Sequence, residues 1–152
     1  MKKYQHLGTL LLRIAMAATF LSAVASRLNL WGSQSSGWNE FISYTAEVLS
    51  FIPISFIPFF ATASTILETL FALMLIAGFK TKIAAMGSSC LTLSFALSMG
   101  YSYGIKSSLD YSVFVDCVAG FLLATFPVYR LSVDTWLAKR KMRSSLTFLT
   151  LS

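Results

Sequence analysis

Four apolar runs, each long enough to cross a lipid bilayer, occupy most of this 152-residue chain. They cover residues 7–30, 61–79, 83–103 and 109–128. A membrane-spanning helix needs about 20 consecutive apolar residues, and a lone segment in lipid can satisfy its backbone polar groups only as a helix. The sequence therefore predicts an all-α protein, a four-helix transmembrane bundle formed by a single domain over residues 1–130.

The composition agrees with a membrane protein. Hydrophobic residues make up 56% of the chain and charged residues only 12%, whereas about a quarter of a typical soluble domain is charged. The net charge of +6 does not indicate nucleic-acid binding, because the basic residues gather at the ends of the apolar runs rather than along one stripe. We expect the lipid bilayer as a partner and no nucleic acid.

The positions of lysine and arginine predict the orientation. With four crossings, most basic residues fall on one side of the membrane, and the positive-inside rule places that side in the cytoplasm. Both termini are then cytoplasmic. The basic residues on this side are Lys2, Lys3, Lys80, Lys82, Arg130, Lys139, Arg140, Lys141 and Arg143.

The first apolar run has a second interpretation. Two lysines, an apolar stretch and the small residues Ala23-Val-Ala25 are also typical of a signal peptide with its cleavage site. Arg13 interrupts the apolar stretch, however, and the apolar character resumes after Arg27. We favour an uncleaved first helix. Cleavage would leave three crossings and remove the polar residues of this run.

The segments outside the runs carry amphipathic patterns. Residues 38–50 predict a short amphipathic helix, which we interpret as an interfacial lid over the outer end of the bundle, with Trp31 and Trp38 at the level of the lipid headgroups. An ordinary surface helix is the alternative. Residues 131–152 are too polar for another crossing and predict a basic amphipathic tail on the anionic inner leaflet.

Glu68 is the only charged residue between Val48 and Phe79. An unpaired charge at the centre of a bilayer costs about 2.5–3.5 kcal/mol on insertion scales, so such a carboxylate is paired, protonated or used. Counting 1.5 Å per residue places Glu68 and Asp116 at similar depths, about 9 Å below the outer boundary. Arg27 is the expected counter-charge.

We expect the outer mouth of the bundle to gather a polar cluster that is either a ligand-binding site or a buried structural cluster. One arginine cannot fully neutralise two carboxylates, so one of them is protonated or bound to something else. Asp110 also has capping-box spacing from Ser107, which offers a local explanation for its charge. No catalytic residue is assigned. The predicted cluster comprises Arg27, Glu68, Asp116, Lys106, Asp110 and Tyr111.

Arg13 and Trp31 are secondary candidates. Arg13 lies fourteen residues before Arg27, on nearly the same helix face, and we expect it to snorkel toward the inner surface or to cap a neighbouring helix. Two further stripes are visible. Ser94, Ser98 and Ser102 predict either helix–helix hydrogen bonds or the wall of a narrow polar cavity. A stripe of small residues predicts close helix approach at Ala15, Ala18, Ser22, Ala25 and Asn29.

The chain carries few residues for independent chemistry. His6 is the only histidine, and Cys90 and Cys117 lie in different apolar runs without a CxxC motif. We expect both cysteines to be small buried apolar residues and predict no metal site. The sequence holds no flavin or nicotinamide fingerprint, so a stand-alone redox enzyme is not predicted and redox chemistry would need a cofactor-bearing partner.

Several strings, taken in order, resemble the DoxX/DoxD-like family of small bacterial integral membrane proteins. The resemblance covers about residues 7–128 and implies a four-helix bundle in the bacterial inner membrane, with an uncleaved first helix. Ala72 stands where a glycine is expected, and Ser108 where a proline is common. The strings are Leu12-Arg-Ile-Ala15, Phe20-Leu-Ser-Ala-Val-Ala-Ser-Arg-Leu-Asn-Leu-Trp-Gly32, Glu68-Thr-Leu-Phe-Ala-Leu-Met-Leu-Ile-Ala-Gly-Phe-Lys-Thr-Lys-Ile-Ala-Ala85 and Gly104-Ile-Lys-Ser-Ser-Leu-Asp-Tyr-Ser-Val-Phe114. The family-like polar positions are Arg13, Arg27, Glu68, Lys106 and Asp110.

Some members of this family are associated with quinone-linked sulfur oxidation or with oxidative-stress complexes. The resemblance thus leads to the hypothesis of a membrane subunit that binds a small lipophilic or redox ligand, such as a quinone, in an outer-facing polar cavity. An oxidoreductase subunit or a second copy of the chain would be its partner. The alternative is a non-catalytic membrane scaffold or assembly protein whose buried charges are structural, since kinship of fold does not fix chemistry.

Overall fold

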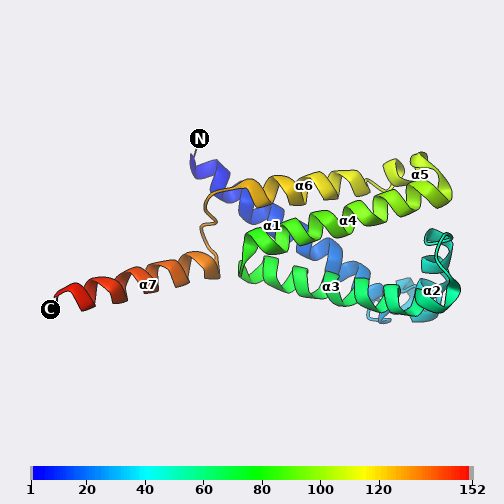
Figure 1. The fold of residues 1–152 in the computed structure, drawn as a ribbon, viewed down its shortest axis with the longest axis horizontal. Coiled ribbons are helices and arrows are strands. Elements are labelled where there is room, and N and C mark those ends of the chain that lie inside the picture. The colour runs from blue at the N-terminus through cyan, green and yellow to red at the C-terminus, as the bar shows by residue number, and fades with distance from the viewer. Residues whose placement is uncertain (1, 151–152) are drawn as a thin grey trace.

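The computed structural model describes the backbone of residues 2–150 and the side chains of residues 4–141. This part of the chain is helical and contains no β-strand (Figure 1). Two 3₁₀ turns, η1 (Gly32–Gln34) and η2 (Ile54–Phe56), flank the second helix. The α-helices are α1 (Lys2–Arg27), α2 (Trp38–Val48), α3 (Ile57–Ala77), α4 (Thr81–Tyr103), α5 (Ile105–Asp110), α6 (Val113–Thr125) and α7 (Val133–Thr150).

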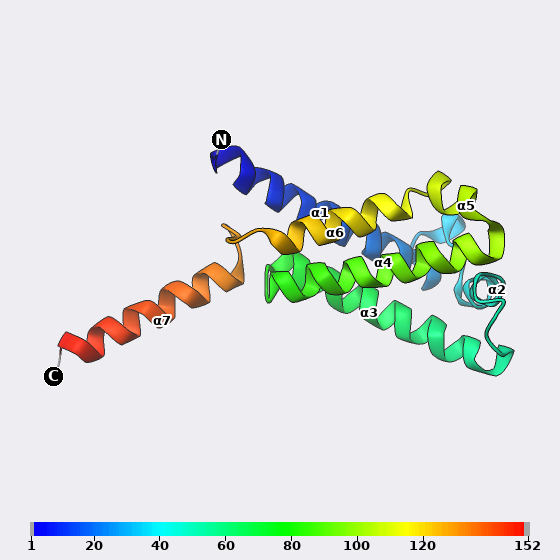
Figure 2. The ribbon, with the colours of Figure 1, turned by 45° about the horizontal axis from the view of Figure 1, so that its top comes forward.

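Helices α1, α3, α4 and α6 pack along one another, and α3 and α4 form an antiparallel pair (Figures 1 and 2). The short helices α2 and α5 lie at one end of this assembly, which we call the α2 end. The turn between α3 and α4 lies at the opposite end, where α7 begins; we call this the α7 end. The first residues of α1 and the last residues of α6 also lie toward the α7 end, so the four long elements alternate in direction.

Three helical segments are long and apolar enough to cross a membrane: Tyr4–Arg27, Ile54–Ala77 and Thr81–Tyr103. They overlap the first three predicted crossings. The prediction of one continuous helix over 109–128 is wrong. The structure interrupts it at Ser112, which has a left-handed φ of +56°, and divides the region between α5 and the 13-residue α6. At 1.5 Å per residue α6 is about 20 Å long, shorter than the ~30 Å hydrocarbon core.

The buried face of α1 carries Arg13, Met16, Ala17 and Phe20. These apolar residues join a core with Leu75 of α3 and other residues of α4 and α6. The face predicted for close helix packing points outward instead, because large apolar residues of α1, rather than its small ones, fill the core. Four residues of that stripe are exposed: Ala15, Ala18, Ser22 and Asn29.

Close approach of helices depends on two glycines that the small-residue stripe did not include. A Cβ added at Gly120 of α6 would lie 3.0 Å from the carbonyl oxygen of Ala85 in α4. A Cβ at Gly87 of α4 would lie 2.4 Å from the ring of Phe71 in α3. At these two glycines α4 packs closely against α6 and against α3.

The predicted amphipathic helix over 38–50 is confirmed as α2. It begins after Gly37, whose φ of +81° is easily adopted only by glycine, and its residues Thr45 and Val48 are buried. Figure 1 shows α2 lying across the α2 end of the long helices. The tail is also helical, but α7 points away from the bundle rather than across its end (Figures 1 and 2). The contact of the tail with a leaflet surface stays a prediction.

Candidate ligand-binding site

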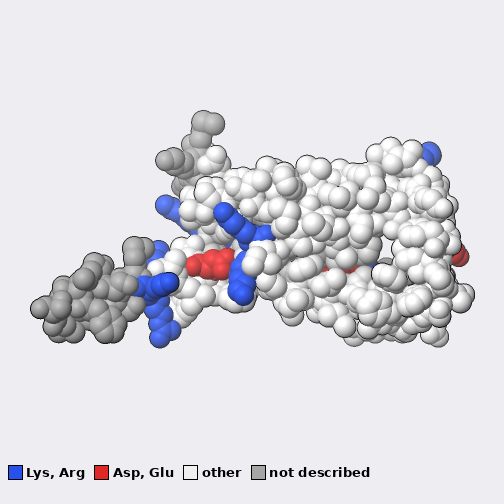
Figure 3. Space-filling model, in the orientation of Figure 1, with Lys and Arg blue, Asp and Glu red and all other residues white. Residues whose placement is uncertain are grey.

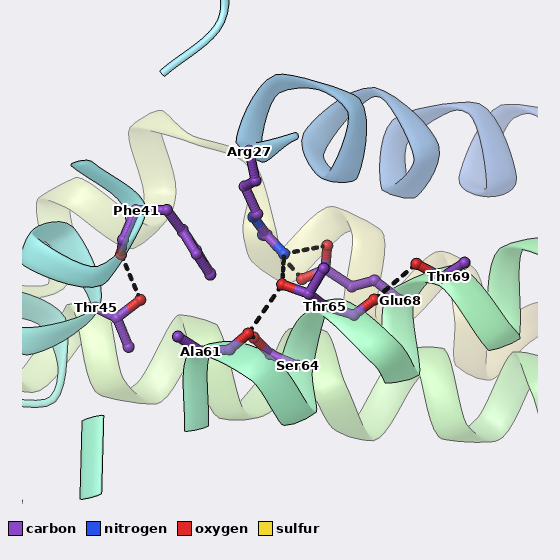
Figure 4. A network of polar contacts seen from close by, with 8 residues as sticks. All are labelled: Arg27, Phe41, Thr45, Ala61, Ser64, Thr65, Glu68 and Thr69. Atoms are coloured by element: carbon purple, nitrogen blue, oxygen red, sulfur yellow. Dashed lines mark hydrogen bonds and ion pairs between the residues drawn. The ribbon is translucent and has the colours of Figure 1, made fainter. Parts of the chain in front are cut away.

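Arg27 and Glu68 form an ion pair between α1 and α3 (Figure 4). Arg27 is the last residue of α1, and its Nη2 donates a hydrogen bond of 3.0 Å to Oε1 of Glu68. Its Nη1 lies 2.9 Å from Oε2 of the same carboxylate and donates a second hydrogen bond of 3.0 Å to Oγ1 of Thr65. The structure thus places the predicted counter-charge in contact with Glu68.

The pair is buried. Glu68 is 2% exposed and the side chain of Arg27 is 11% exposed. The Oε2 atom of Glu68 has the close ion-pair contact but no hydrogen bond of suitable geometry. Removing one partner of a buried pair leaves an uncompensated charge and typically costs 3–5 kcal/mol. Neither residue can be treated as a dispensable surface charge.

Two neighbours orient the guanidinium group of Arg27. The ring of Phe41, from α2, covers one face, with its centroid 3.8 Å from Cζ, which is a cation–π contact. Thr65 accepts from Nη1 while its own hydroxyl donates to the carbonyl oxygen of Ala61 at 2.9 Å. Within the described part of the chain, Nε of Arg27 has no hydrogen-bond partner. The ion pair therefore leaves one donor edge of Arg27 unused.

A cavity of about 520 Å³ lies beside this arginine, between α2, α3 and α4. This volume is within the range of sites for small molecules. Among the described residues, Arg27 is the only charged one in its wall, and Glu68 does not line it. Figure 3 shows the surface hollowed between α3 and α4 near the α2 end. Aromatic rings make up much of the wall, from Phe41, Tyr44, Phe51, Phe59, Phe60 and Phe95.

The cavity faces the side of the helices rather than their end. Phe59, Phe60 and Leu67 of α3 line it and are themselves exposed on the long side of the molecule, while α2 covers its end. In a bilayer, such a surface contacts lipid. A ligand would reach Arg27 by passing between α3 and α4.

The serine stripe of α4 serves both predicted purposes. Ser94 and Ser98 line the cavity, and the hydroxyl of Ser98 has no hydrogen-bond partner among the described residues. Ser102, one turn further, donates to the carbonyl oxygen of Val48 at 2.7 Å and lies 2.9 Å from Oγ of Ser50. The hydroxyl of Ser94 donates to the carbonyl oxygen of Leu91 at 2.7 Å, so of the two only Ser98 has a free donor for a ligand. Ser102 holds the end of α2 against α4.

Tyr44 adds a second polar group to the wall. Burial raises the pKa of its hydroxyl, and the neighbouring Tyr111 and Glu47 raise it further. The hydroxyl therefore stays protonated at neutral pH and can donate a hydrogen bond. Since Tyr44 lines the cavity, this donor is within the same space as Arg27.

The other predicted cluster residues lie apart from the ion pair. Asp116 is half-buried on α6, and within the described part of the chain its carboxylate has neither a hydrogen bond nor an ion pair. Lys106 and Asp110 pair with each other on exposed α5. Tyr111 is 71% exposed. None of the four lines the cavity, so the structure assembles only Arg27 and Glu68 from the predicted six.

The local explanation proposed for Asp110 is not observed. Asp110 is the last residue of α5 rather than the start of a long helix, and neither α5 nor α6 has a side-chain cap at its N-terminus. Trp31, a secondary candidate, is exposed and donates its indole N–H to the carbonyl oxygen of Ser22 at 3.1 Å. It closes the turn after α1 and does not line the cavity.

Arg13 caps α3, as predicted. It is 1% exposed, and each of its three side-chain nitrogens donates to a backbone carbonyl. Nε bonds to Leu75 at 2.9 Å, Nη2 to Ile76 at 3.0 Å and Nη1 to Leu131 at 3.3 Å. These acceptors belong to the last turn of α3 and to the segment before α7, so Arg13 holds the α7 end together.

Sequence reasoning missed three supporting residues. In the sequence, Phe41 belongs only to an amphipathic face, and Thr65 is only a threonine in an apolar helix. Neither pattern identifies a contact with Arg27. Asp134 accepts hydrogen bonds from the backbone N–H groups of Lys80 and Thr81 at 2.7 and 2.8 Å. An acidic residue at the start of α7 indicates a cap for α7 itself, and nothing in the sequence indicated that it caps α4.

The cysteines and the metal-ligand inventory add no second site. Both cysteines are free, and Cys90 is exposed on α4, so the expectation that both are buried is wrong for Cys90. Cys117 is half-buried, and its carbonyl oxygen accepts a hydrogen bond from Ser89 at 2.8 Å. No group of three or more metal-ligating side chains occurs in the described part of the chain.

Comparison with curated proteins and with solved structures found no match. A family model described as DoxX does match, and it covers residues 8–100. The matched region contains most of α1, the whole of α2 and α3 and most of α4, and with them Arg13, the Arg27–Glu68 pair and nearly the whole cavity wall. Because this region is more than half of the chain, the protein belongs to the DoxX family.

Proposed function

We propose that this membrane protein binds a small lipophilic ligand in the cavity under α2, with the polar head of the ligand beside Arg27. The observation that carries the proposal is a single arginine in the wall of a mainly aromatic and aliphatic cavity. Ligand sites commonly combine apolar walls with a few polar groups that fix orientation. The position of the cavity on the lipid-facing side supports a ligand that is dissolved in the membrane.

A quinone-like molecule fits this chemistry. Its flat ring can stack on the aromatic walls, and its carbonyl oxygens can accept hydrogen bonds from Nε of Arg27, from Tyr44 or from Ser98. These three groups replace Asp116, Lys106 and Tyr111 as the proposed polar contacts, because they line the cavity. No redox group of the chain itself is involved, so electrons would come from and return to an oxidoreductase partner.

The proposal is tested by ligand-dependent thermal stability in lipid nanodiscs. A ligand that binds only the folded protein raises its apparent stability with concentration. A short-chain quinone should raise the unfolding temperature of the natural protein. In Ser98→Phe, a phenyl ring occupies the cavity without changing any charge, and the rise should be lost.

Leu97→Phe is the matched control. Leu97 neighbours Ser98 on α4 but is 60% exposed and does not line the cavity. This variant should respond to the quinone as the natural protein does. An equal response in Ser98→Phe would contradict binding in the cavity, and no response in the natural protein would contradict a quinone as ligand.

The orientation follows from charge. Figure 3 shows basic side chains gathered at the α7 end, including the exposed Lys80, Lys82 and Arg130. Under the positive-inside rule this end and both termini are cytoplasmic, in the inner membrane of a bacterium. The cavity then opens in the outer leaflet, and α6 forms a fourth, shorter transmembrane element. The accessibility of the introduced cysteine to thiol reagents, in Lys80→Cys and in Lys106→Cys, would test on which side of the membrane each residue lies.

A structural role is the second candidate. It is favoured by the contacts of Arg27 and Glu68, which join α1 to α3 whatever the cavity holds. If the protein is a scaffold or assembly partner, the charges only hold the helices together. The double variant Arg27→Met/Glu68→Met should then restore both folding and cellular function. Restored folding without function would instead favour the ligand-binding role.

A further inference from the structure

Glu68 holds the guanidinium group of Arg27 but is not itself part of the cavity wall. Arg27 lines the cavity and Glu68 does not, so a ligand would meet the arginine while its charge is already neutralised. We infer that Glu68 is a specificity-determining residue that makes the cavity select uncharged amphiphiles and reject anionic ones. This inference rests on the proposed function, since it requires that the cavity bind a ligand.

The geometry leaves no free positive charge for an anion. Both Nη atoms of Arg27 face the Glu68 carboxylate, at 3.0 and 2.9 Å. Thr65 takes a further hydrogen bond from Nη1, and Phe41 covers one face of the guanidinium. Among the described residues only its Nε–H has no hydrogen-bond partner, so this group can still donate one hydrogen bond.

An anionic head at this edge would put two carboxylate-like charges on one arginine. Coulomb repulsion is weakly screened in a buried, low-dielectric site, and desolvating an ion is costly unless a counter-charge compensates it. The described residues of the cavity wall include no second lysine or arginine to do so. An anion therefore loses its hydration without gaining a net attraction.

An uncharged acceptor avoids both costs. A carbonyl oxygen can accept from Nε, which has no other hydrogen-bond partner among the described residues, and from the unpaired hydroxyl of Ser98. A hydrogen bond to a charged donor contributes more than one between neutral groups. The aromatic wall then holds the apolar part of the ligand.

The experiment changes the charge of Glu68 and keeps the cavity. Because Glu68 does not line the cavity, Glu68→Gln preserves its shape almost unchanged. The probes are methyl palmitate and hexadecyl sulfonate, which carry equally long saturated chains with an uncharged or a permanently anionic head. Apparent dissociation constants come from the probe dependence of the unfolding temperature in nanodiscs.

The natural protein should bind the ester at least about tenfold more tightly than the sulfonate, and Glu68→Gln should reverse this preference. Thr65→Val removes one hydrogen bond of Arg27 without changing any charge, so its preference should stay that of the natural protein. Equal or tighter binding of the sulfonate by the natural protein, or an unchanged preference in folded Glu68→Gln, would overturn the inference but leave the ligand site standing.

Failure of the proposed function gives a different result. Neither probe would then stabilise the natural protein, or both would stabilise Ser98→Phe to the same extent, which would overturn the inference together with the site. If Glu68→Gln does not fold, the ratio of the two dissociation constants is compared in the natural protein and in Thr65→Val. A sulfonate that binds as tightly as the ester, or more tightly, then overturns the inference.

Discussion

The two buried arginines of α1 have opposite surroundings. Arg13 is enclosed at the α7 end, where its three side-chain nitrogens all donate to backbone carbonyls of the last turn of α3 and of Leu131. Arg27 stands at the α2 end, beside a cavity, with a carboxylate on one side and an unused donor on the other. The same residue type on one helix face thus lies in two different environments.

The comparison teaches that burial of a charge does not identify a binding site. Arg13 is the more deeply buried of the two, at 1% exposure, and it does not line the cavity beside Arg27. Its charge is spread over carbonyl dipoles at the C-terminus of a helix, which is a favourable place for a cation. What distinguishes Arg27 is a donor left unsatisfied by the fold and a space in front of it.

Replacing Arg13 should have the largest effect on stability. Arg13→Met removes three hydrogen bonds from a charged donor and leaves buried carbonyls without partners, so the free energy of unfolding should fall by about 3–5 kcal/mol. Unfolding titrations in mixed detergent micelles measure this loss. Arg13→Lys should recover only part of it, because lysine lacks the planar set of donors. Full recovery by lysine would show that charge alone matters at this end.

Breaking the pair at the α2 end should cost somewhat less, because Arg27 retains partial exposure. Glu68→Met and Arg27→Met should each lower the free energy of unfolding by about 2–4 kcal/mol. The double variant should be more stable than the sum of the two losses predicts, with a coupling of about 1–3 kcal/mol. Unfolding titrations of the natural protein, the two single variants and the double variant form a double-mutant cycle that measures this coupling. Additive losses would mean that the pair is not coupled.

Gly78 sharpens the comparison at the Arg13 end. Its φ is +66°, and an added Cβ would lie 2.4 Å from Nη2 of Arg13 and 2.5 Å from Cβ of Ser132. Gly78→Ala should therefore cost about 2–3 kcal/mol, from backbone strain and from displacement of Arg13. Gly104→Ala is the control, since its φ is also positive, at +86°, but no atom lies within 4 Å of the added Cβ. Its loss should be smaller, about 1 kcal/mol.

Most of the fold could be predicted because apolar length and charge position follow directly from the solvent that the chain must face. The three long membrane-capable segments, the helix α2 and the contact between Arg27 and Glu68 all followed from such patterns. The predicted helix over 109–128 failed at Ser112. A left-handed serine between two helices needs neither glycine nor proline, so the sequence contains no mark of this break.

The cavity could be predicted only in outline. The serine stripe indicated one candidate wall and residues 38–50 a lid, but a space depends on how far apart helices pack. That distance is set by contacts such as Gly87 on Phe71, which are specific pairs rather than patterns along one element. Asp116 was predicted to join the cluster of Arg27 and Glu68 but lies apart from it. Equal depth along two helices does not place two side chains on facing sides.

The smallest expected effect compares two aspartates in different settings. Asp134 accepts hydrogen bonds from the N–H groups of Lys80 and Thr81 and from Oγ1 of Thr81, so it caps α4 beside the Arg13 network. Asp134→Ala should lower the free energy of unfolding by about 1–2 kcal/mol, as expected for loss of an N-cap. Asp110 pairs only with Lys106 on an exposed face, and Asp110→Ala should cost about 0.3–0.5 kcal/mol.

Detergent unfolding titrations at low and high salt separate the two cases. The Asp110 contribution should vanish at high salt, because exposed ion pairs are screened, whereas the Asp134 contribution should persist, since its hydrogen bonds are partly buried. An Asp134→Ala loss as small and as salt-sensitive as that of Asp110→Ala would show that the α7 end is held by Arg13 alone. The contrast between the α7 end, where Arg13 is fully hydrogen-bonded, and the α2 end, where a cavity lies beside Arg27, would then depend on one arginine rather than on a network.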